Sequence, residues 1–263
     1  MYSEEHLTFL KKRRRKRLLI IAIQVIIVLA FIVIWQVLAD LGIINTFISS
    51  SPKLMLKTLV SLHQDNNLYQ HIAITIYETF LSFSLATIIG CIIAIILWWN
   101  SFIAKIVDPF LTVLNSLPKV ALGPIIIIWA GAGMNSIIIM ALLISVIITI
   151  INVYQGFMDI DHNKLKLMHS FKASKWQILI KLLLPGSFAS IVSTLKINVS
   201  MSLIGVIMGE FLVSKKGIGY LIMYGSQVFN LNLVMTGIII LCVVATIMYY
   251  LVSYIEKKII KNK

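Results

Sequence analysis

Two lysines, Lys119 and Lys196, are the only basic residues placed well inside the long apolar stretches of this sequence. A cation at that depth in a membrane costs at least a few kcal/mol on insertion scales, so it normally faces a cavity or a partner. Lys119 follows Pro118, and hydroxyl and amide side chains surround Lys196, features that open a helix to water. We expect both lysines to line a pore and to lower the barrier for an anion, because no carboxylate within the predicted spans is positioned to neutralise them. The alternative is that each side chain snorkels to an interface or meets a backbone carbonyl freed by a proline.

The acidic residues and cysteines do not form a catalytic or metal-binding pattern. Glu78, Asp108 and Glu210 map near the ends of apolar stretches, and no His-Asp or His-Glu cluster lies inside one, which argues against a membrane-embedded enzyme. Cys91 and Cys242 both fall within apolar stretches, where a buried free thiol is the usual state. The alternative class is a secondary transporter or channel, although such proteins commonly carry acidic or histidine relays in mid-membrane.

The composition sets the class of protein. Hydrophobic residues make up 59% of the 263 residues, charged residues only 13%, and the mean hydropathy is +0.97. This balance lies far outside the range of soluble proteins and predicts an all-α, polytopic membrane protein. We expect one transmembrane domain at residues 18–255, between a basic N-terminus at 1–17 and a basic tail at 256–263.

Six membrane spans are expected along the chain. The first is an uncharged run at residues 18–39, long enough to cross a bilayer as a helix. It follows the basic sequence KKRRRKR; a cleavable signal peptide is the alternative, but the run is too long for a typical signal sequence. A short interfacial helix is expected at about 53–63. The second span is expected at about 72–99. The third and fourth spans meet in a hairpin turn at 130–135, and the fourth ends near 158. The fifth and sixth are expected at about 182–209 and 233–255.

The third span is expected to be irregular. Residues 120–158 carry no charge, but they are too few for two full spans, so the first of the two must begin upstream of Pro118. We expect its helix to be broken or kinked at Pro118 and Pro124, which frees backbone groups inside the membrane. Such backbone is tolerated only where it faces protein or a watery cavity, so this span is a candidate for the pore lining.

The distribution of basic residues tests this topology. Seventeen of the 23 lysines and arginines fall on one predicted side of the membrane and four on the other. This asymmetry follows the positive-inside rule and places both termini in the cytoplasm. We expect the protein to lie in the plasma membrane. The same asymmetry explains most of the net charge of +13. The expected partner of these basic residues is membrane lipid and not nucleic acid.

The predicted cytoplasmic loop at 159–185 can present folded structure to water. Asp161 is a candidate N-cap for a first helix, and Ser174 stands three residues before Gln177, the spacing of a capping box that would start a second helix at Lys175. The chain therefore turns around residues 172–173, and Pro185 is tolerated in the first turn of a further helix.

One face of the first of these helices is apolar. Its stripe could fill a groove on a partner protein, or the helix could lie on the lipid headgroups, which its lysines would favour. The stripe consists of Leu165, Met168 and Phe171.

This loop resembles the cytoplasmic coupling loop of ABC-importer permeases. That family has Glu-Ala-Ala, three residues, Gly, nine residues, Ile, one residue and Leu-Pro. Anchored on Leu184-Pro185, the pattern places Leu182 at the Ile position, Lys172 at the Gly position and Lys166 at the Glu position. The residues that match best are Ala173, Ser174, Trp176, Leu184 and Pro185.

Two further stretches carry the resemblance over residues 50–250. The sequence DPFLTVLNSLPKVALGPIIIIWAGAG at 108–133 is similar to the third span of the sulfonate, taurine, nitrate and thiamine-pyrimidine branch of these permeases. Glu210, followed by Gly217-Ile218-Gly219-Tyr220, resembles that branch's Glu and its Gly-Leu-Gly-Tyr.

The resemblance implies a transport function and several partners. It implies a homodimeric permease of six spans with a short coupling helix between spans four and five, two ATPase subunits below and an extracytoplasmic binding protein above. This chain would hold no cofactor, since ATP and Mg would be used by the partner ATPase; the phosphate-binding pattern G-x-x-x-x-G-K-[ST] is absent here. The solute would be a small anion of the aliphatic sulfonate, taurine or nitrate type.

The resemblance also assigns candidate sites. It implies a gate or binding-protein contact at Glu210, Gly217 and Gly219, where a purely structural loop is the alternative. It also implies coupling to the ATPase through Leu165, Met168, Phe171, Lys172, Ala173, Ser174, Leu184 and Pro185. Two departures matter. Lys172 replaces a glycine, at a cost of roughly 1 kcal/mol if the turn is left-handed, and Lys166 replaces an acidic residue, so the docking contact should be more apolar than is usual.

Overall fold

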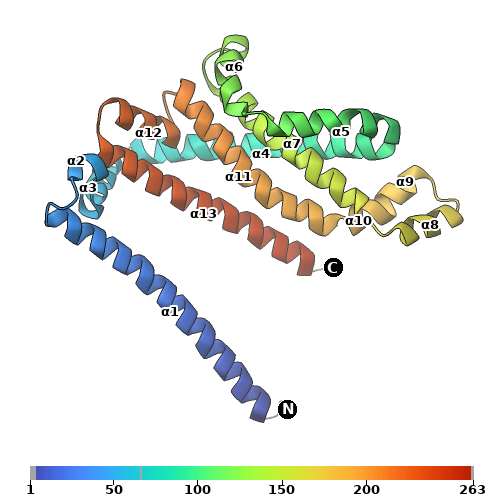
Figure 1. Ribbon diagram of the computed structural model, residues 1–263, viewed down its shortest axis with the longest axis horizontal. Coiled ribbons are helices and arrows are strands. Elements are labelled where there is room, and N and C mark those ends of the chain that lie inside the picture. The colour runs from blue at the N-terminus through green and yellow to red at the C-terminus, as the bar shows by residue number, and fades with distance from the viewer. Residues whose placement is uncertain (1–3, 66, 262–263) are drawn as a thin grey trace.

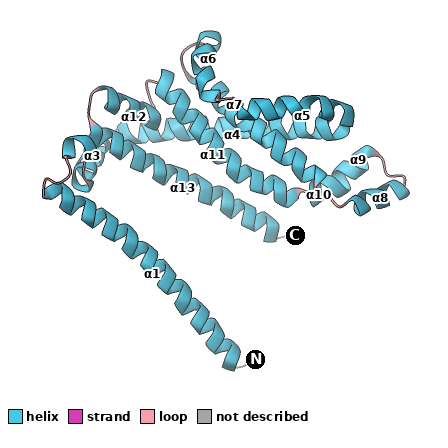
Figure 2. Ribbon diagram, in the orientation of Figure 1, coloured by secondary structure: helices cyan, strands magenta, loops and turns pink. Residues whose placement is uncertain are grey.

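The computed structural model describes residues 4–65 and 67–261, and every regular element in these ranges is a helix (Figures 1 and 2). Five helices are long and apolar enough to cross a membrane. They are α1 (Glu4–Asp40), α4 (Asn67–Trp99), α7 (Met134–Met158), α11 (Phe188–Val213) and α13 (Leu231–Lys261).

A sixth span is built from broken helices. Helix α5 (Ser101–Ser116) is followed by the 3-10 turn η1 (Lys119–Leu122) and by α6 (Gly123–Ala130), and the two halves meet at 87°. Leu117 is extended, as a residue before proline prefers, so the helix ends there and the predicted break at Pro118 is confirmed. Pro124 does not break a helix, contrary to the prediction. It lies in the first turn of α6, where a missing N–H leaves no bond unmade.

The other predicted boundaries hold with two shifts. Gly131 and Gly133 have positive φ and form the expected hairpin between α6 and α7. Span five begins at Phe188 rather than at residue 182, because the chain is interrupted around Pro185. Span six extends past residue 255, so Glu256 belongs to α13.

Helices α4, α7 and α11 form the centre of the bundle, and small residues let them approach closely. Gly205 and Gly209 of α11 lie against Ala141 and Ile137 of α7, where an added Cβ would overlap the α7 backbone. Gly90 of α4 lies against Thr149 of α7, where an added Cβ would overlap the threonine side chain. Close helix packing through small residues is a main source of association inside a membrane.

The first span stands apart from this centre. Figure 1 shows α1 diverging from α13 as it runs toward the N-terminus. At its other end, Gln36 Oε1 accepts a hydrogen bond of 3.0 Å from the backbone N–H of Lys53 in α3 (Pro52–Gln64). Helix α3 confirms the short helix expected at 53–63, and the four-residue helix α2 (Thr46–Ser49) precedes it.

Candidate functional site

The loop between α7 and α11 folds as the capping pattern predicts. The Asp161 carboxylate accepts a hydrogen bond of 2.8 Å from the Asn163 backbone and starts α8 (His162–Ser170). The helix ends where the N–H of Ala173 reaches the carbonyl of Met168 at 3.0 Å and the N–H of Lys172 reaches that of His169 at 2.9 Å. This is a Schellman motif, and Lys172 adopts the left-handed φ of 51° that glycine usually supplies.

The second helix of the loop begins with the expected capping box. Ser174 Oγ accepts from the Gln177 N–H at 3.3 Å, and Gln177 Oε1 accepts from the Ser174 N–H at 2.8 Å. Helix α9 (Lys175–Ile178) then widens into a π-helical turn, η2 (Leu179–Leu183), followed by the short α10 (Leu184–Gly186). Leu184 and Pro185 therefore lie in a joint between α9 and α11.

The apolar stripe of α8 is divided between two surroundings. Leu165 and Met168 are half-buried against an apolar cluster from α4, α7 and the α9–η2 segment, so part of each side chain is already covered within this chain. Phe171 is 74% exposed, and Leu167 and Trp176 are also exposed, although the docking set predicted from the sequence includes neither. We call the apolar cluster that covers Leu165 and Met168 the inner cluster. Its buried members are Ala94, Val153, Phe157, Ile178, Leu179 and Leu183.

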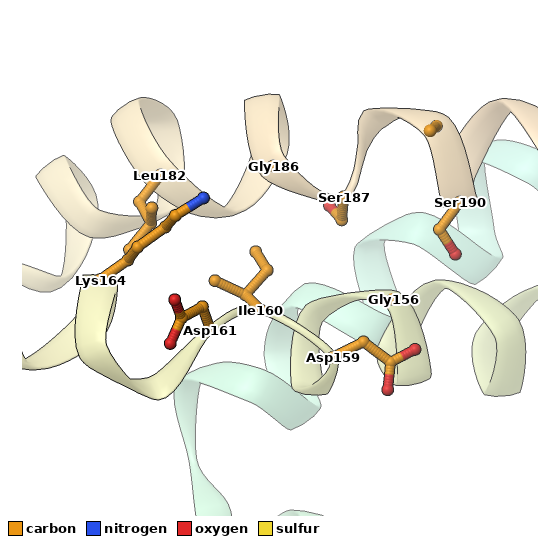
Figure 3. A pocket seen from close by; sticks show the side chains of 10 residues that line it. Gly156, Asp159, Ile160, Asp161, Lys164, Leu182, Gly186, Ser187 and Ser190 are labelled. Atoms are coloured by element: carbon orange, nitrogen blue, oxygen red, sulfur yellow. The ribbon is translucent and has the colours of Figure 1, made fainter.

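A cavity of about 420 Å³ lies between the end of α7, the start of α8 and the start of α11 (Figure 3). Its acidic residues are engaged: Asp161 caps α8, and Asp159 accepts a hydrogen bond of 2.8 Å from Gln155. Gly156, Lys164 and Ser190 also line it. The cavity keeps the start of α8 from packing tightly on α11.

Lys119 lies at the break of the third span. Its Nζ donates a hydrogen bond of 3.1 Å to the carbonyl of Asn115, the acceptor that a continuous helix would have offered to the N–H of Lys119. The ammonium group thus compensates for the interrupted helix, which is the alternative foreseen for this residue. The side chain remains partly exposed, next to the exposed Pro118.

Lys196 is not an uncompensated cation. Its ammonium forms an ion pair with the carboxylate of Glu256 in α13, and both side chains are largely buried. The expectation that no carboxylate could neutralise Lys196 is wrong, because α13 continues beyond the predicted end of span six and brings Glu256 beside α11. Because its charge is paired, Lys196 does not supply a free positive charge to a pore.

Glu210 lies near the C-terminal end of α11 and is only 1% exposed. Its Oε1 accepts from Thr75 Oγ1 of α4 at 2.6 Å, and its Oε2 accepts from the N–H of Gly219 at 2.5 Å. Gly219 belongs to the first turn of α12 (Ile218–Gln227). The Glu210 carboxyl group therefore caps the N-terminus of α12.

Two residues of α4 complete this cap. Thr75 Oγ1 accepts from the N–H of Ile218 at 2.8 Å, and His71 Nδ1 accepts from the N–H of Gly217 at 2.9 Å. His71 and Thr75 were not predicted as site residues. Their signal in the sequence is a series of polar positions, with Glu78, at the start of an apolar span.

The two glycines owe their identity to this contact. Gly217 has a φ of 111°, and a Cβ there would overlap the Glu210 carboxyl group. A Cβ on Gly219 would come within 2.8 Å of Glu210 Oε2. The Glu210 carboxyl group makes its contacts inside the fold, with α4 and α12, as the structural alternative expects. A gate or binding-protein contact of the surrounding segment stays a prediction.

An all-α bundle with a broken span, a helix-turn-helix loop at one end and a capped short helix at the other is the architecture of a membrane transport component. Residues 86–261 match the family model described as "Binding-protein-dependent transport system inner membrane component", and the chain belongs to this family. It is a transport subunit of the ABC-permease class rather than an enzyme, and the ATPase is a separate subunit. The family implies an ATPase and a substrate-binding protein as partners.

Known proteins similar to this chain agree with this assignment. A Haemophilus influenzae protein named as an ABC transporter permease is 29% identical, over 89% of this chain and 95% of that protein. A Bacillus subtilis protein named as an aliphatic sulfonates transport permease is 28% identical, over 88% of this chain and 83% of that protein. Further relatives are named for taurine and nitrate, so the resemblance to this branch is confirmed.

A solved structure shares the fold. A chain of the MetNI methionine ABC transporter in an inward-facing conformation superposes with a TM-score of 0.64 at 20% identity, covering 74% of this chain and 95% of that one.

Proposed function

We propose that this chain forms the translocation path of an ATP-driven importer as a homodimer in the plasma membrane, with both termini in the cytoplasm. The α8–α9 segment carries this proposal. It is a capped, water-facing pair of short helices whose exposed Phe171 and Leu167 suit a groove on an ATPase. ATP and Mg are then used by that partner, and this chain holds no cofactor of its own.

The orientation follows from the basic residues. Lys12 to Arg17 of α1 are all exposed, and they lie at the end of α1 opposite to its contact with α3. The positive-inside rule puts this end, the C-terminal end of α13 and the α8–α9 segment in the cytoplasm. The Glu210 cap then lies at the extracytoplasmic face, beneath the site where a binding protein would deliver the solute.

A second copy would cover surfaces that a single chain leaves bare. The outermost part of the broken span carries Trp129, which is 82% exposed, beside the exposed Ile128. The lipid-facing alternative cannot apply to the freed backbone at residues 117–119, since such backbone must face protein or water. We propose that the α5–α6 break faces the dimer axis and lines the path.

The proposed solute is a small anion of the sulfonate, taurine or nitrate type. The names of relatives support this class. Within the chain it depends on Lys119, because the charge of Lys196 is matched by Glu256.

Reconstitution tests the proposal directly. The chain is co-expressed with an ATPase and a binding protein from the same organism, purified through a tag on the permease and placed in liposomes. We expect the ATPase to co-purify and the liposomes to take up radiolabelled taurine, nitrate or an alkanesulfonate only with internal ATP. Uptake that needs no ATPase, driven by an ion gradient, would establish a secondary transporter instead.

A further inference from the structure

The inner ends of α4 and α9 are joined by three side chains that we call the Trp99 clamp: Trp99, Lys175 and Trp176. Lys175 Nζ donates a hydrogen bond of 3.0 Å to the carbonyl of Trp99 and lies 5.9 Å from the centroid of its ring. The rings of Trp99 and Trp176 meet edge to face with centroids 5.4 Å apart. The clamp thus connects the docking segment to the end of a membrane span far away in sequence.

Each contact of the clamp has a physical reason to persist. Trp99 is the last residue of α4, so its carbonyl has no partner within the helix, and a cation at this end is favoured by the helix dipole. A tilted aromatic pair and a cation over an indole add attraction that does not depend on the bilayer.

The inner cluster extends this connection to α7. It takes Ala94 from α4, Val153 and Phe157 from α7, Ile178 from α9, and Leu179 and Leu183 from η2. Leu165 and Met168 of α8 pack against the same residues. Because a close-packed apolar interior transmits displacement rather than absorbing it, α8 and α9 should move together with the ends of α4 and α7.

The connection to α11 is of a different kind. It runs through the π-helical turn η2, the short α10 and a break at Ser187 before α11 begins. Wide turns of this type are frequent at functional sites, and beyond η2 the chain is interrupted at Pro185 and again at Ser187. The cavity of Figure 3 lies between the start of α8 and the start of α11, so these two elements have room to move relative to each other.

We propose that the Trp99 clamp delivers the motion of the docked ATPase to α4 and α7, while α10 and the break at Ser187 act as the hinge that lets α11 follow separately. Lys175 and Trp176 are then positioning residues for coupling and not part of the ATPase contact. This inference rests on the proposed function, in which α8 docks an ATPase.

The first test separates docking from coupling. Lys175→Ala/Trp176→Ala removes the clamp, Lys175→Arg/Trp176→Phe keeps a cation and an aromatic ring, and Lys181→Ala removes an exposed lysine of the same segment. Each variant is co-expressed with the ATPase and placed in nanodiscs, and ATP hydrolysis is measured with and without the binding protein. We expect the double alanine variant to retain the ATPase but to lose about tenfold or more of the stimulation by the binding protein. The conservative pair and Lys181→Ala should keep it.

Two results would overturn the clamp. Loss of ATPase co-purification in the double alanine variant would place Trp176 in the docking surface, and normal stimulation would leave the clamp without a role. Failure of the wild-type chain to retain the ATPase is a separate result, which contradicts the proposed function itself.

A distance measurement tests the proposal without the double alanine variant, in case that variant folds poorly. Spin labels at Lys166→Cys in α8 and Phe80→Cys in α4, in a background with Cys91 and Cys242 replaced by serine, report the α8–α4 distance within one protomer diluted among unlabelled ones. With the clamp intact, this distance should stay constant when ATP binds, and a label pair from α8 to Ile204 of α11 should change. A change in the α8–α4 distance of the intact clamp would contradict the proposal.

Discussion

The carboxylate of Glu210 accepts a hydrogen bond of 2.5 Å from the backbone of Gly219, nine residues further along the chain. This contact fixes the short helix α12 on the N-terminal part of α4 and the C-terminal end of α11. The glutamate of the motif that resembles a gate in the sequence is therefore an internal brace of the fold.

Replacing Glu210 should reduce stability before it affects transport. Glu210→Ala leaves the Thr75 hydroxyl and the Gly219 N–H without their buried acceptor, which should cost about 1–3 kcal/mol per unsatisfied group. A thermal-unfolding assay in detergent measures the loss. Asp108→Ala, which removes an exposed carboxylate, should leave the midpoint nearly unchanged. A Glu210→Ala protein as stable as the wild type but inactive would restore the gating role.

Gly217→Ala separates steric overlap from backbone strain. Both Gly217 and Gly42 have positive φ, but only Gly217 has the Glu210 carboxyl group where a Cβ would lie, whereas nothing lies within 4 Å of that position at Gly42. Gly42→Ala should cost roughly 1 kcal/mol from the left-handed backbone alone. Gly217→Ala should cost clearly more, seen as a lower unfolding midpoint and less protein in the membrane. Equal losses would mean that the contact with Glu210 contributes nothing.

Local signals in the sequence were sufficient for much of the inner loop. Asp161 and the pair Ser174 and Gln177 act within three residues of their targets, so their caps could be predicted and are confirmed. The turn at Lys172 followed in the same way, although a lysine there hides the usual signal. The broken span followed from Pro118, since proline constrains the backbone wherever it stands.

Contacts between distant segments could not be predicted in this way. Lys196 and Glu256 are separated by the whole outer segment and by α13, and only the continuation of α13 past the apolar run brings them together. The direction in which Leu165 and Met168 face depends on the inner cluster, whose members come from three distant parts of the chain. The helical period predicts that these apolar residues share one face of α8, but it does not predict which of them pack inside this chain and which stay exposed.

The ion pair between Lys196 and Glu256 should be worth more than a surface pair. Both side chains are less than one-third exposed, so Lys196→Gln alone leaves a mostly buried carboxylate unpaired and should lower the unfolding midpoint, by less than for a fully buried pair. The exchange Lys196→Glu/Glu256→Lys should recover much of this loss in a thermal-unfolding assay. If the exchange is no better than the sum of its single variants, the pair does not stabilise the bundle.

Docking should depend on Phe171 more than on its buried neighbours. Phe171→Asp places a charge on an exposed apolar surface, so it should abolish ATPase co-purification while the permease stays folded in the membrane. Met168→Asp would instead put a charge against the inner cluster and should lower the amount of folded protein. Normal ATPase binding by the Phe171→Asp chain would remove α8 from the docking surface.

Lys119 is the one cation that the anion hypothesis now depends on, and its two proposed roles predict different responses. If the ammonium only completes the hydrogen bonding of Asn115 at the break, Lys119→Gln should retain transport, because its amide N–H can still donate to that carbonyl. If the charge also lowers the barrier for an anion, Lys119→Gln should fold and bind the ATPase normally but lose several-fold in the rate of taurine, nitrate or alkanesulfonate uptake, and Lys119→Arg should retain it. Lys196→Gln/Glu256→Gln is the matched control, since it removes a lysine whose charge is already neutralised, and its uptake should follow its stability alone. Uptake measured in liposomes at equal permease and ATPase content decides between the two roles: a wild-type rate in Lys119→Gln means that the charge of the solute has no counterpart in this chain.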